Sequence, residues 1–214
     1  MKLGSRLISV LIAILIVCSL TGCSKKAELG EVHVVTGIFL DYSPSQKMYQ
    51  LILEIAELND YESKKSISQK LLKARGNSIE DAFSKLNQIS EKELYFSHAE
   101  LILLGSGFQK ISLKPMLHYL IEHPSIPSDI TLCMANTELF STTKTSEDSL
   151  FEPLSRLLER KEKKYQTKLY SLYQKEGKVF SLPLISQNGE TFSITSTVFF
   201  DFQYQGTTKE TPLL

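Results

Sequence analysis

The chain has 214 residues, 42% of them hydrophobic and 22% charged, and its 24 cations balance its 24 anions. This neutral balance argues against a nucleic-acid-binding protein, which needs a basic face to release the counterions of phosphates. A chain of this length can bury one large hydrophobic core or two small ones.

The N-terminus has the pattern of a bacterial lipoprotein signal peptide. Lys2 and Arg6 frame the start of a mostly apolar run over residues 7–20, which is too short to span a membrane. The run ends in four residues that look like a lipobox, Leu20, Thr21, Gly22 and Cys23. In a lipobox the cysteine thiol receives diacylglycerol and the chain is cut before it. We therefore predict a signal peptide over 1–22 and lipid attachment at Cys23; the alternative is an ordinary cleaved signal beside a chance cysteine.

Lipid attachment at Cys23 would also limit which cysteines could form a disulfide. Cys18 leaves with the signal peptide and Cys23 carries lipid, so Cys133 is the one thiol left in the mature chain. No intrachain disulfide is then available, and stability has to come from the core. The anchor itself gains about 0.8 kcal/mol per buried methylene, and two or more acyl chains hold a protein stably on a bilayer.

We place one domain at 32–205, after a lipidated polar spacer at 23–31 and before a short tail at 206–214. The domain starts with two predicted strands, Val32–Asp41 and Met48–Leu58, joined through a polar turn segment. Both carry apolar residues at alternate positions, so they are expected to form a hairpin.

A polar loop over 59–65 and a weaker strand around 67–74 are expected next. A helix should then start after Ser78, because this residue can accept from the first turn and Glu80 and Asp81 suit the helix dipole. The apolar residues that follow recur at helical spacing: Ile79, Ala82, Phe83, Leu86 and Ile89.

Buried strands are predicted at 99–104 and 129–135, with a second helix over about 113–122 between them. The glycines at 105–107 should turn the chain after the first of these strands. The pair His123-Pro124 should end the helix, since the residue before proline is disfavoured in helical geometry.

The last third is expected to contain a Thr- and Ser-rich loop at 136–147, a helix that starts near Pro153, and a helix capped by Thr167 and closed at Gly177. A final strand alternates apolar and mainly polar residues, with Phe192, Ile194, Val198, Phe200, Phe202 and Tyr204 on its apolar positions. The elements together indicate an α+β domain with a mixed, largely antiparallel sheet and helices packed on it.

Residue types that could carry catalysis are present but poorly spaced for it. His118 and His123 are five residues apart and do not stack on one helical face as a metal pair would. Ser97 and His98 are adjacent, so in extended backbone they point to opposite faces. We therefore predict no catalytic residue, no metal site and no cofactor, and hence no enzyme.

Three further groups receive structural interpretations. Glu54 and Glu57 lie on a predicted strand without an obvious acid or base partner. Cys133 is surrounded by apolar sequence, which favours a buried, unreactive thiol. His98 is expected to make a hydrogen bond at a strand end, and Gly76 to supply a turn with positive φ.

Several stretches also form an ordered set: the lipobox with Glu28-Leu29 behind it, Thr36–Asp41, Tyr49–Leu51, Gly76–Ala82 and Leu94–Gly105. Their order and spacing resemble the N-terminal part of the Ger(x)C family, the lipoprotein subunits of nutrient germinant receptors in spore-forming bacteria. The stretch from Gly76 is similar to the family's Gly-x-Thr/Ser-Ile-x-x-Ala helix start, and the stretch from Leu94 to its Tyr-x-x-His segment before an apolar strand.

The chain departs from the family pattern in two ways. The family has Trp-Asp shortly after the lipid cysteine, whereas Ser24-Lys25 stand here and the chain contains no tryptophan. Family members also continue into a further C-terminal region, whereas this sequence stops at Leu214.

The resemblance implies a receptor accessory subunit, held by lipid on Cys23 at the outer face of the cytoplasmic membrane, which is the spore inner membrane. Its partners would be two integral-membrane subunits, and its role would be assembly and signal coupling. The alternatives are a solute-binding lipoprotein of a transporter, for which the mature chain is short, and a lipid-tethered hydrolase, for which the sequence supplies no acid/base pair.

Overall fold

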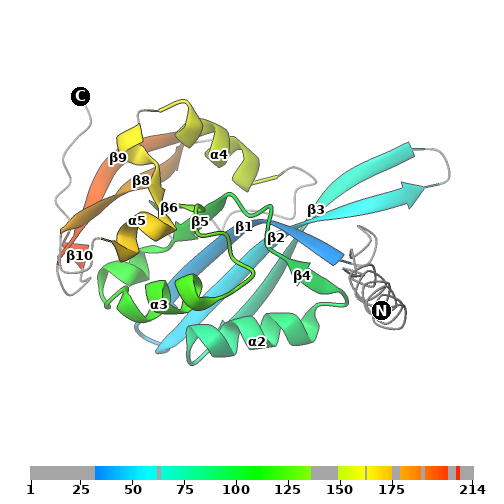
Figure 1. Ribbon diagram of the computed structural model, residues 1–214, viewed down its shortest axis with the longest axis horizontal. Helices are drawn as coiled ribbons and strands as arrows, with labels where there is room; N and C mark the ends of the chain where they lie inside the picture. The colour runs from blue at the N-terminus through cyan, green and yellow to red at the C-terminus, as the bar shows by residue number, and fades with distance from the viewer. Residues whose placement is uncertain are drawn as a thin grey trace, which may run out of the picture.

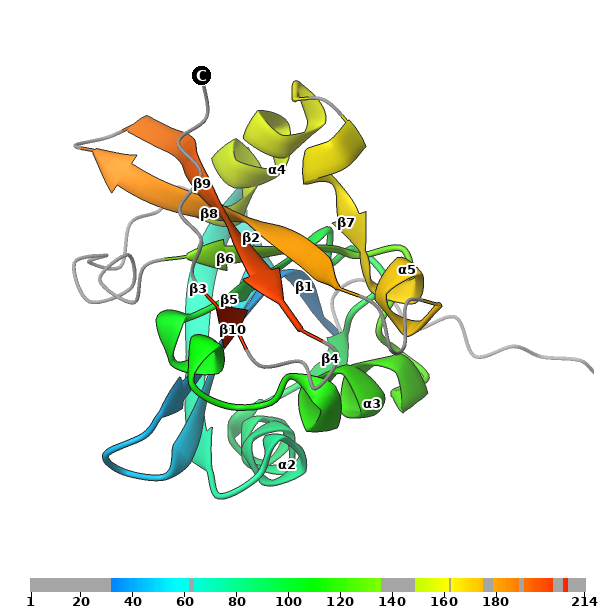
Figure 2. The same ribbon diagram turned by 90° about the vertical axis from the view of Figure 1, so that its left-hand side faces the viewer.

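The computed structural model describes residues 32–61, 64–135, 149–161, 163–174, 179–188, 191–201 and 206–207. Within them the chain forms one mixed sheet of ten strands with four α-helices packed against it (Figures 1 and 2). The α+β prediction is therefore confirmed. The predictions for the signal peptide at 1–22, the spacer at 23–31, the loop at 136–147, and Gly177, Phe202 and Tyr204 fall outside the described residues.

The strands are β1 (Val32–Ser43), β2 (Met48–Tyr61), β3 (Lys64–Gly76), β4 (Glu93–Tyr95), β5 (Leu101–Leu104), β6 (Thr131–Ala135), β7 (Thr167–Lys168), β8 (Phe180–Asn188), β9 (Thr191–Phe200) and β10 (Gly206–Thr207). The helices are α2 (Ile79–Ile89), α3 (Lys114–Glu122), α4 (Phe151–Glu159) and α5 (Leu169–Tyr173), with 3₁₀ turns η1 (Ser106–Gln109) and η3 (Lys163–Tyr165). None of the described helices is long and apolar enough to cross a bilayer.

The sheet has antiparallel flanks and a parallel centre. Its order is β10-β9-β8-β6-β5-β1-β2-β3, with β4 beside β1 and β7 beside β6. The neighbours β8, β6, β5 and β1 run parallel, whereas β1–β2–β3 and β8–β9 are antiparallel hairpins. The expectation of a largely antiparallel sheet thus describes the hairpins and not the centre, where strands distant in sequence pair through helical crossovers.

Local signals placed several elements well. The β1–β2 hairpin forms in the expected order, and α2 spans the expected residues. Ser78 Oγ accepts from the backbone N–H of Asp81 at 3.0 Å, and the Asp81 carboxylate accepts from Asn77 N–H at 2.8 Å. The predicted N-cap of this helix is therefore confirmed.

Other predictions were wrong. Most of the loop expected at 59–65 is strand, because β2 continues to Tyr61 and β3 starts at Lys64; the two strands form an arm that projects beyond β1 (Figure 1). Thr167 lies in β7 and does not cap α5, whose N-cap is Lys168. Strand β8 was not expected, since Pro183 lies inside it and proline usually marks an edge or a break.

Each face of the sheet has its own core. One face is covered by α2, α3 and α5, with Phe83, Leu86, Phe108 and Leu120 among its fully or nearly fully buried residues. The other face is covered by α4, whose Phe151 and Leu154 pack with Phe39, Ile52 and Leu103. Strand residues therefore supply apolar side chains to both faces, as a sheet covered on both sides requires.

Candidate functional site

Two adjoining cavities lie on the α4 face of the sheet. The first has a volume of about 280 Å³ and lies between the segment before β5, the start of β6, α4 and β7. The second has a volume of about 510 Å³ and lies between α4 and strands β1, β2 and β3. His98, Glu100 and Ser155 line both cavities, so the two form one groove alongside α4.

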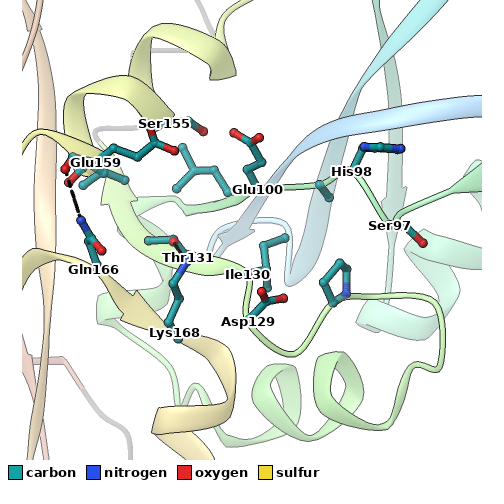
Figure 3. A pocket seen from close by; sticks show the side chains of 14 residues that line it. Ser97, His98, Glu100, Asp129, Ile130, Thr131, Ser155, Glu159, Gln166 and Lys168 are labelled. Carbon is teal, nitrogen blue, oxygen red and sulfur yellow. Dashed lines mark hydrogen bonds between the residues drawn. The ribbon is translucent and has the colours of Figure 1, made fainter. Parts of the chain in front are cut away.

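The first cavity is mainly polar (Figure 3). Lys168 Nζ donates to Thr131 Oγ1 at 2.8 Å, and this lysine makes no ion pair with any other described residue. Glu100, Asp129 and Glu159 bring three exposed carboxylates to the same cavity. Such a site offers groups of both signs to a small polar molecule.

The same cavity contains Ser97 and His98, which the sequence had excluded as a nucleophile and base. Both side chains are exposed, and no hydrogen bond links them to each other in the described part of the chain. His98 makes a ring contact with Tyr95 at 6.0 Å. The strand-end hydrogen bond predicted for His98 is not formed with any described residue.

The second cavity is mainly apolar. Val34, Ala56, Ile67 and Phe151 line it, and Gln69 Oε1 is buried there without a hydrogen-bond partner among the described residues. An unpaired buried amide oxygen costs free energy of about 1–3 kcal/mol unless a ligand or water satisfies it. The groove therefore combines an apolar half and a polar half.

Glu54 holds α4 against the sheet. Its carboxylate is buried and accepts from Thr36 Oγ1 at 2.8 Å, Ser149 Oγ at 2.7 Å and Leu150 N–H at 2.6 Å. Sequence reasoning found no partner for Glu54 because Ser149 is 95 residues away. With all three donors hydrogen-bonded to it, this carboxylate positions one end of α4 and is not a free acid or base.

His33 was missed at the sequence level; it is buried and belongs to a polar cluster that reaches the surface. Its Nδ1 lies 3.0 Å from Ser90 Oγ and its Nε2 lies 3.3 Å from Glu57 Oε1, which in turn lies 3.6 Å from Lys70 Nζ. Burial lowers the pKa of His33, and the Glu57 carboxylate opposes that effect. The cluster ties the start of β1 to the end of α2 and to the base of the arm.

The remaining candidates are structural. Cys133 is fully buried, and burial raises the pKa of its thiol, so the inert interpretation is confirmed. His118 pairs with Glu122 at 2.8 Å on the exposed side of α3, whereas His123 packs against Phe83 and Phe96. In the part of the chain that the structure describes, no group of His, Cys, Asp or Glu is arranged to hold a metal ion.

Glycines in and just after the motif stretches are needed where parts of the chain approach closely. A Cβ on Gly37 would overlap the ring of Phe151, and one on Gly105 or Gly107 would overlap Asp41 or the carbonyl of Tyr42. A Cβ on Gly76 would meet the backbone of Ala82; the φ of Gly76 does not lie in the left-handed region, so the positive φ predicted for it was wrong. These motif residues therefore serve the fold.

Comparisons with known proteins identify a family. Residues 25–187 match the family model described as "Spore germination protein N-terminal domain". No curated protein matches the chain.

A solved structure titled "Crystal Structure of the GerBC protein" is similar over 82% of this chain and 51% of that one, with 12% identity and a TM-score of 0.39. The chain thus spans about half the length of that relative. The lipobox residues Leu20 to Cys23 precede both the family match and the described residues. Because the family model covers most of the chain, the protein belongs to the family of spore germination proteins defined by this N-terminal domain.

Proposed function

We propose that this chain is a lipid-anchored accessory subunit of a nutrient germinant receptor, which acts in spore germination by assembly with two integral-membrane subunits and by signal coupling. The family consists of non-enzymatic receptor subunits, so the chain is not an enzyme. The observation that carries the proposal is the position of the family match. It begins at residue 25, two residues after the cysteine of the lipobox.

The arrangement of the motif residues supports the same role. Gly37, Gly105 and Gly107 are needed where the chain packs too closely for a Cβ atom. Among the described residues, the groove beside α4 contains no nucleophile that is hydrogen-bonded to a base. The role that we propose requires of this protein a surface for its partners and no catalytic pair. Lipid on Cys23 would keep it at the outer face of the membrane that holds its partners.

The test is affinity capture of the protein, tagged at its C-terminus, from gently solubilised membranes of sporulating cells. Two integral-membrane receptor subunits are expected to co-purify, and Cys23→Ala is expected to abolish their recovery and the lipid mass on the mature N-terminus. Cys18→Ser is the matched control, because it changes a signal-peptide cysteine and keeps the lipobox. Recovery of the anchored protein without receptor subunits would contradict the proposal.

A solute-binding lipoprotein is the second candidate, and the polar cavity with the Lys168 cation and three carboxylates favours it. A solute that binds only the folded state raises its stability by RT ln(1 + [L]/Kd). Thermal unfolding with amino acids, sugars and nucleosides separates the two candidates. A rise in Tm together with capture of transporter components would support the second.

A further inference from the structure

The start of β1 fixes which end of the domain is closest to the lipid anchor. Val32 follows Cys23 by nine residues, and nine extended residues span at most about 30 Å. If Cys23 is lipidated, as the proposed function requires, Val32 stays within that distance of the bilayer, and the end of the domain that contains it is the end nearest the anchor. We call it the tether end; it includes the start of β1, β4, the end of α2 and the arm formed by β2 and β3 (Figure 1).

A row of side chains crosses four strands at the tether end. Tyr95 pairs with Val34, Val34 pairs with Ala56, and Ala56 pairs with Gln69. Residues in register on neighbouring strands share one face of a sheet, and Ile67 shares the face of Gln69 because it is two residues away on β3. We call Tyr95, Val34, Ala56 and Ile67 the apolar row.

The rest of the described chain covers the apolar row only in part. Ile67 is 64% exposed and Tyr95 is 43% exposed, while Val34 and Ala56 are half-buried. Helix α4 lies on the same face of the sheet, where its Phe151 packs over Gly37, but the second cavity separates α4 from the row. Within the described part of the chain, the row is therefore an apolar surface that remains largely open on the α4 face.

Exposed apolar side chains gather at the tether end more than elsewhere. Five large apolar side chains are exposed in the described residues: Ile67, Ile89, Tyr95, Tyr170 and Val179. Ile89 ends α2, and the next residue, Ser90, contacts His33 near the start of β1, so Ile89 lies at the tether end with Ile67 and Tyr95. Tyr170 lies on α5, on the side of the domain away from the arm (Figure 1).

Charges near the row are of both signs. Glu57 pairs with Lys70, and the segment before β4 carries exposed Glu91, Lys92 and Glu93. Tyrosine suits the headgroup region, because its side chain has an apolar body and a polar end. Mixed charge offers little attraction for anionic lipid in particular.

We propose that the apolar row is a membrane-contact surface, through which Tyr95 and Ile67 enter the interfacial region of the bilayer that holds the Cys23 lipid. A few exposed apolar side chains bind a bilayer weakly when the protein is free in solution. The tether raises their effective concentration at the membrane, so contact becomes the favoured state of the anchored chain. The contact depends on apolar burial, and it is therefore expected on zwitterionic lipid and in high salt.

Because the sequence contains no tryptophan, a single introduced indole can be followed without background from other tryptophans. Tyr95→Trp and Tyr170→Trp each place one indole at an exposed aromatic position, one at the tether end and one away from it. The mature chain would be coupled through Cys23 to a maleimide lipid in phosphatidylcholine vesicles with brominated acyl chains. Coupling is selective because the Cys133 thiol is fully buried.

Bromine is expected to reduce the fluorescence of the Tyr95→Trp protein, relative to vesicles without bromine, and to leave the Tyr170→Trp protein unchanged. Adding Ile67→Asp to Tyr95→Trp should diminish the loss, and thermal unfolding would verify that each variant folds. Equal quenching of both indoles, or none at Tyr95→Trp, would overturn the proposal.

The chemical coupling separates this proposal from the proposed function. It fixes the chain to the vesicle whether or not cells attach lipid to Cys23. An unquenched Tyr95→Trp protein together with lipid on Cys23 in cells would refute the membrane-contact surface alone. Quenching on vesicles with no lipid on Cys23 in cells would leave the surface in place and refute the anchored receptor subunit.

Discussion

Asp41 Oδ1 accepts a hydrogen bond from the backbone N–H of Gly107 at 3.0 Å, which joins the end of β1 to the turn after β5. The same oxygen accepts from Tyr42 N–H at 2.8 Å, and Asp41 is buried. Asp41 ends one motif stretch of the family resemblance, and Gly107 lies two residues after another, which ends at Gly105. The hydrogen bond therefore fixes the ends of two strands whose residues lie 66 positions apart in the sequence.

Replacing Asp41 tests this contact. Asp41→Ala leaves the buried Gly107 N–H without its acceptor, and an unpaired buried donor costs about 1–3 kcal/mol. Asp41→Asn keeps an oxygen at the same position and should lose less of the free energy of unfolding. Urea denaturation of both variants measures the difference; equal losses would show that the hydrogen bond contributes little.

Gly37→Ala is expected to destabilise the domain because the new methyl group would overlap the Phe151 ring. Overpacking of this kind costs about 1–3 kcal/mol. Phe151→Ala removes the ring atoms that the new methyl group would overlap, so the double variant should lose less stability than the two single losses added together. A double-mutant cycle by chemical denaturation checks this, and additive losses would argue against the contact.

Glu54→Gln should weaken the attachment of α4. The carboxylate accepts three hydrogen bonds, from Thr36, Ser149 and Leu150, whereas an amide presents one oxygen and two donors. A hydrogen bond to a charged group contributes about 1.5–3 kcal/mol, so a loss near the middle of that range is expected. Relative to the parent chain, the rate of backbone amide hydrogen exchange should increase more in α4 than in α2. Uniform acceleration in both helices would point to global destabilisation instead.

His123 should make stability depend on pH. Its ring is half-buried among Phe83, Phe96 and Tyr119, its Nδ1 is buried without a described partner, and burial lowers its pKa below 6.5. The unfolded chain therefore takes up a proton near pH 6.5 that the folded chain resists. Stability should fall as pH drops below about 6.5, by up to about 1.4 kcal/mol per pH unit for this group.

His123→Phe keeps an aromatic ring and removes the titration. The loss of stability between pH 7 and pH 5 should be smaller in this variant than in the parent chain, and an NMR titration should give His123 a pKa below its ordinary value. Burial lowers the pKa of His33 as well, so part of the pH dependence should persist. An unchanged pH dependence in His123→Phe would contradict the prediction.

Local signals predicted the elements that local interactions form. The Ser78 cap with the acidic first turn of α2 and the alternation of the β1–β2 hairpin are contained in short stretches of sequence. Strand β8 was not predicted because Pro183 interrupts its pattern. The arm was not predicted because its polar residues are typical of a loop. In both cases, pairing with a neighbouring strand overrode local preference.

The candidate site was harder to predict because its residues come together from distant parts of the chain. Glu54 meets Ser149 across 95 residues, and His33 meets Ser90 across 57. The spacing of residues within one helix or strand predicts only neighbours in that element, so it does not predict such pairs. The groove beside α4 likewise combines Lys168 with Glu100, which a single sequence does not place together.

Strand β3 is the last strand in the order of the described sheet, so no described strand pairs with its outer edge. An unpaired strand edge is a template for pairing with another molecule, and the anchoring that we propose would confine copies to two dimensions, where encounters between edges are frequent. Five of the thirteen residues of β3 are lysine or arginine. Two such edges repel each other, so the strand that closes the fold also disfavours edge-to-edge aggregation among neighbouring copies.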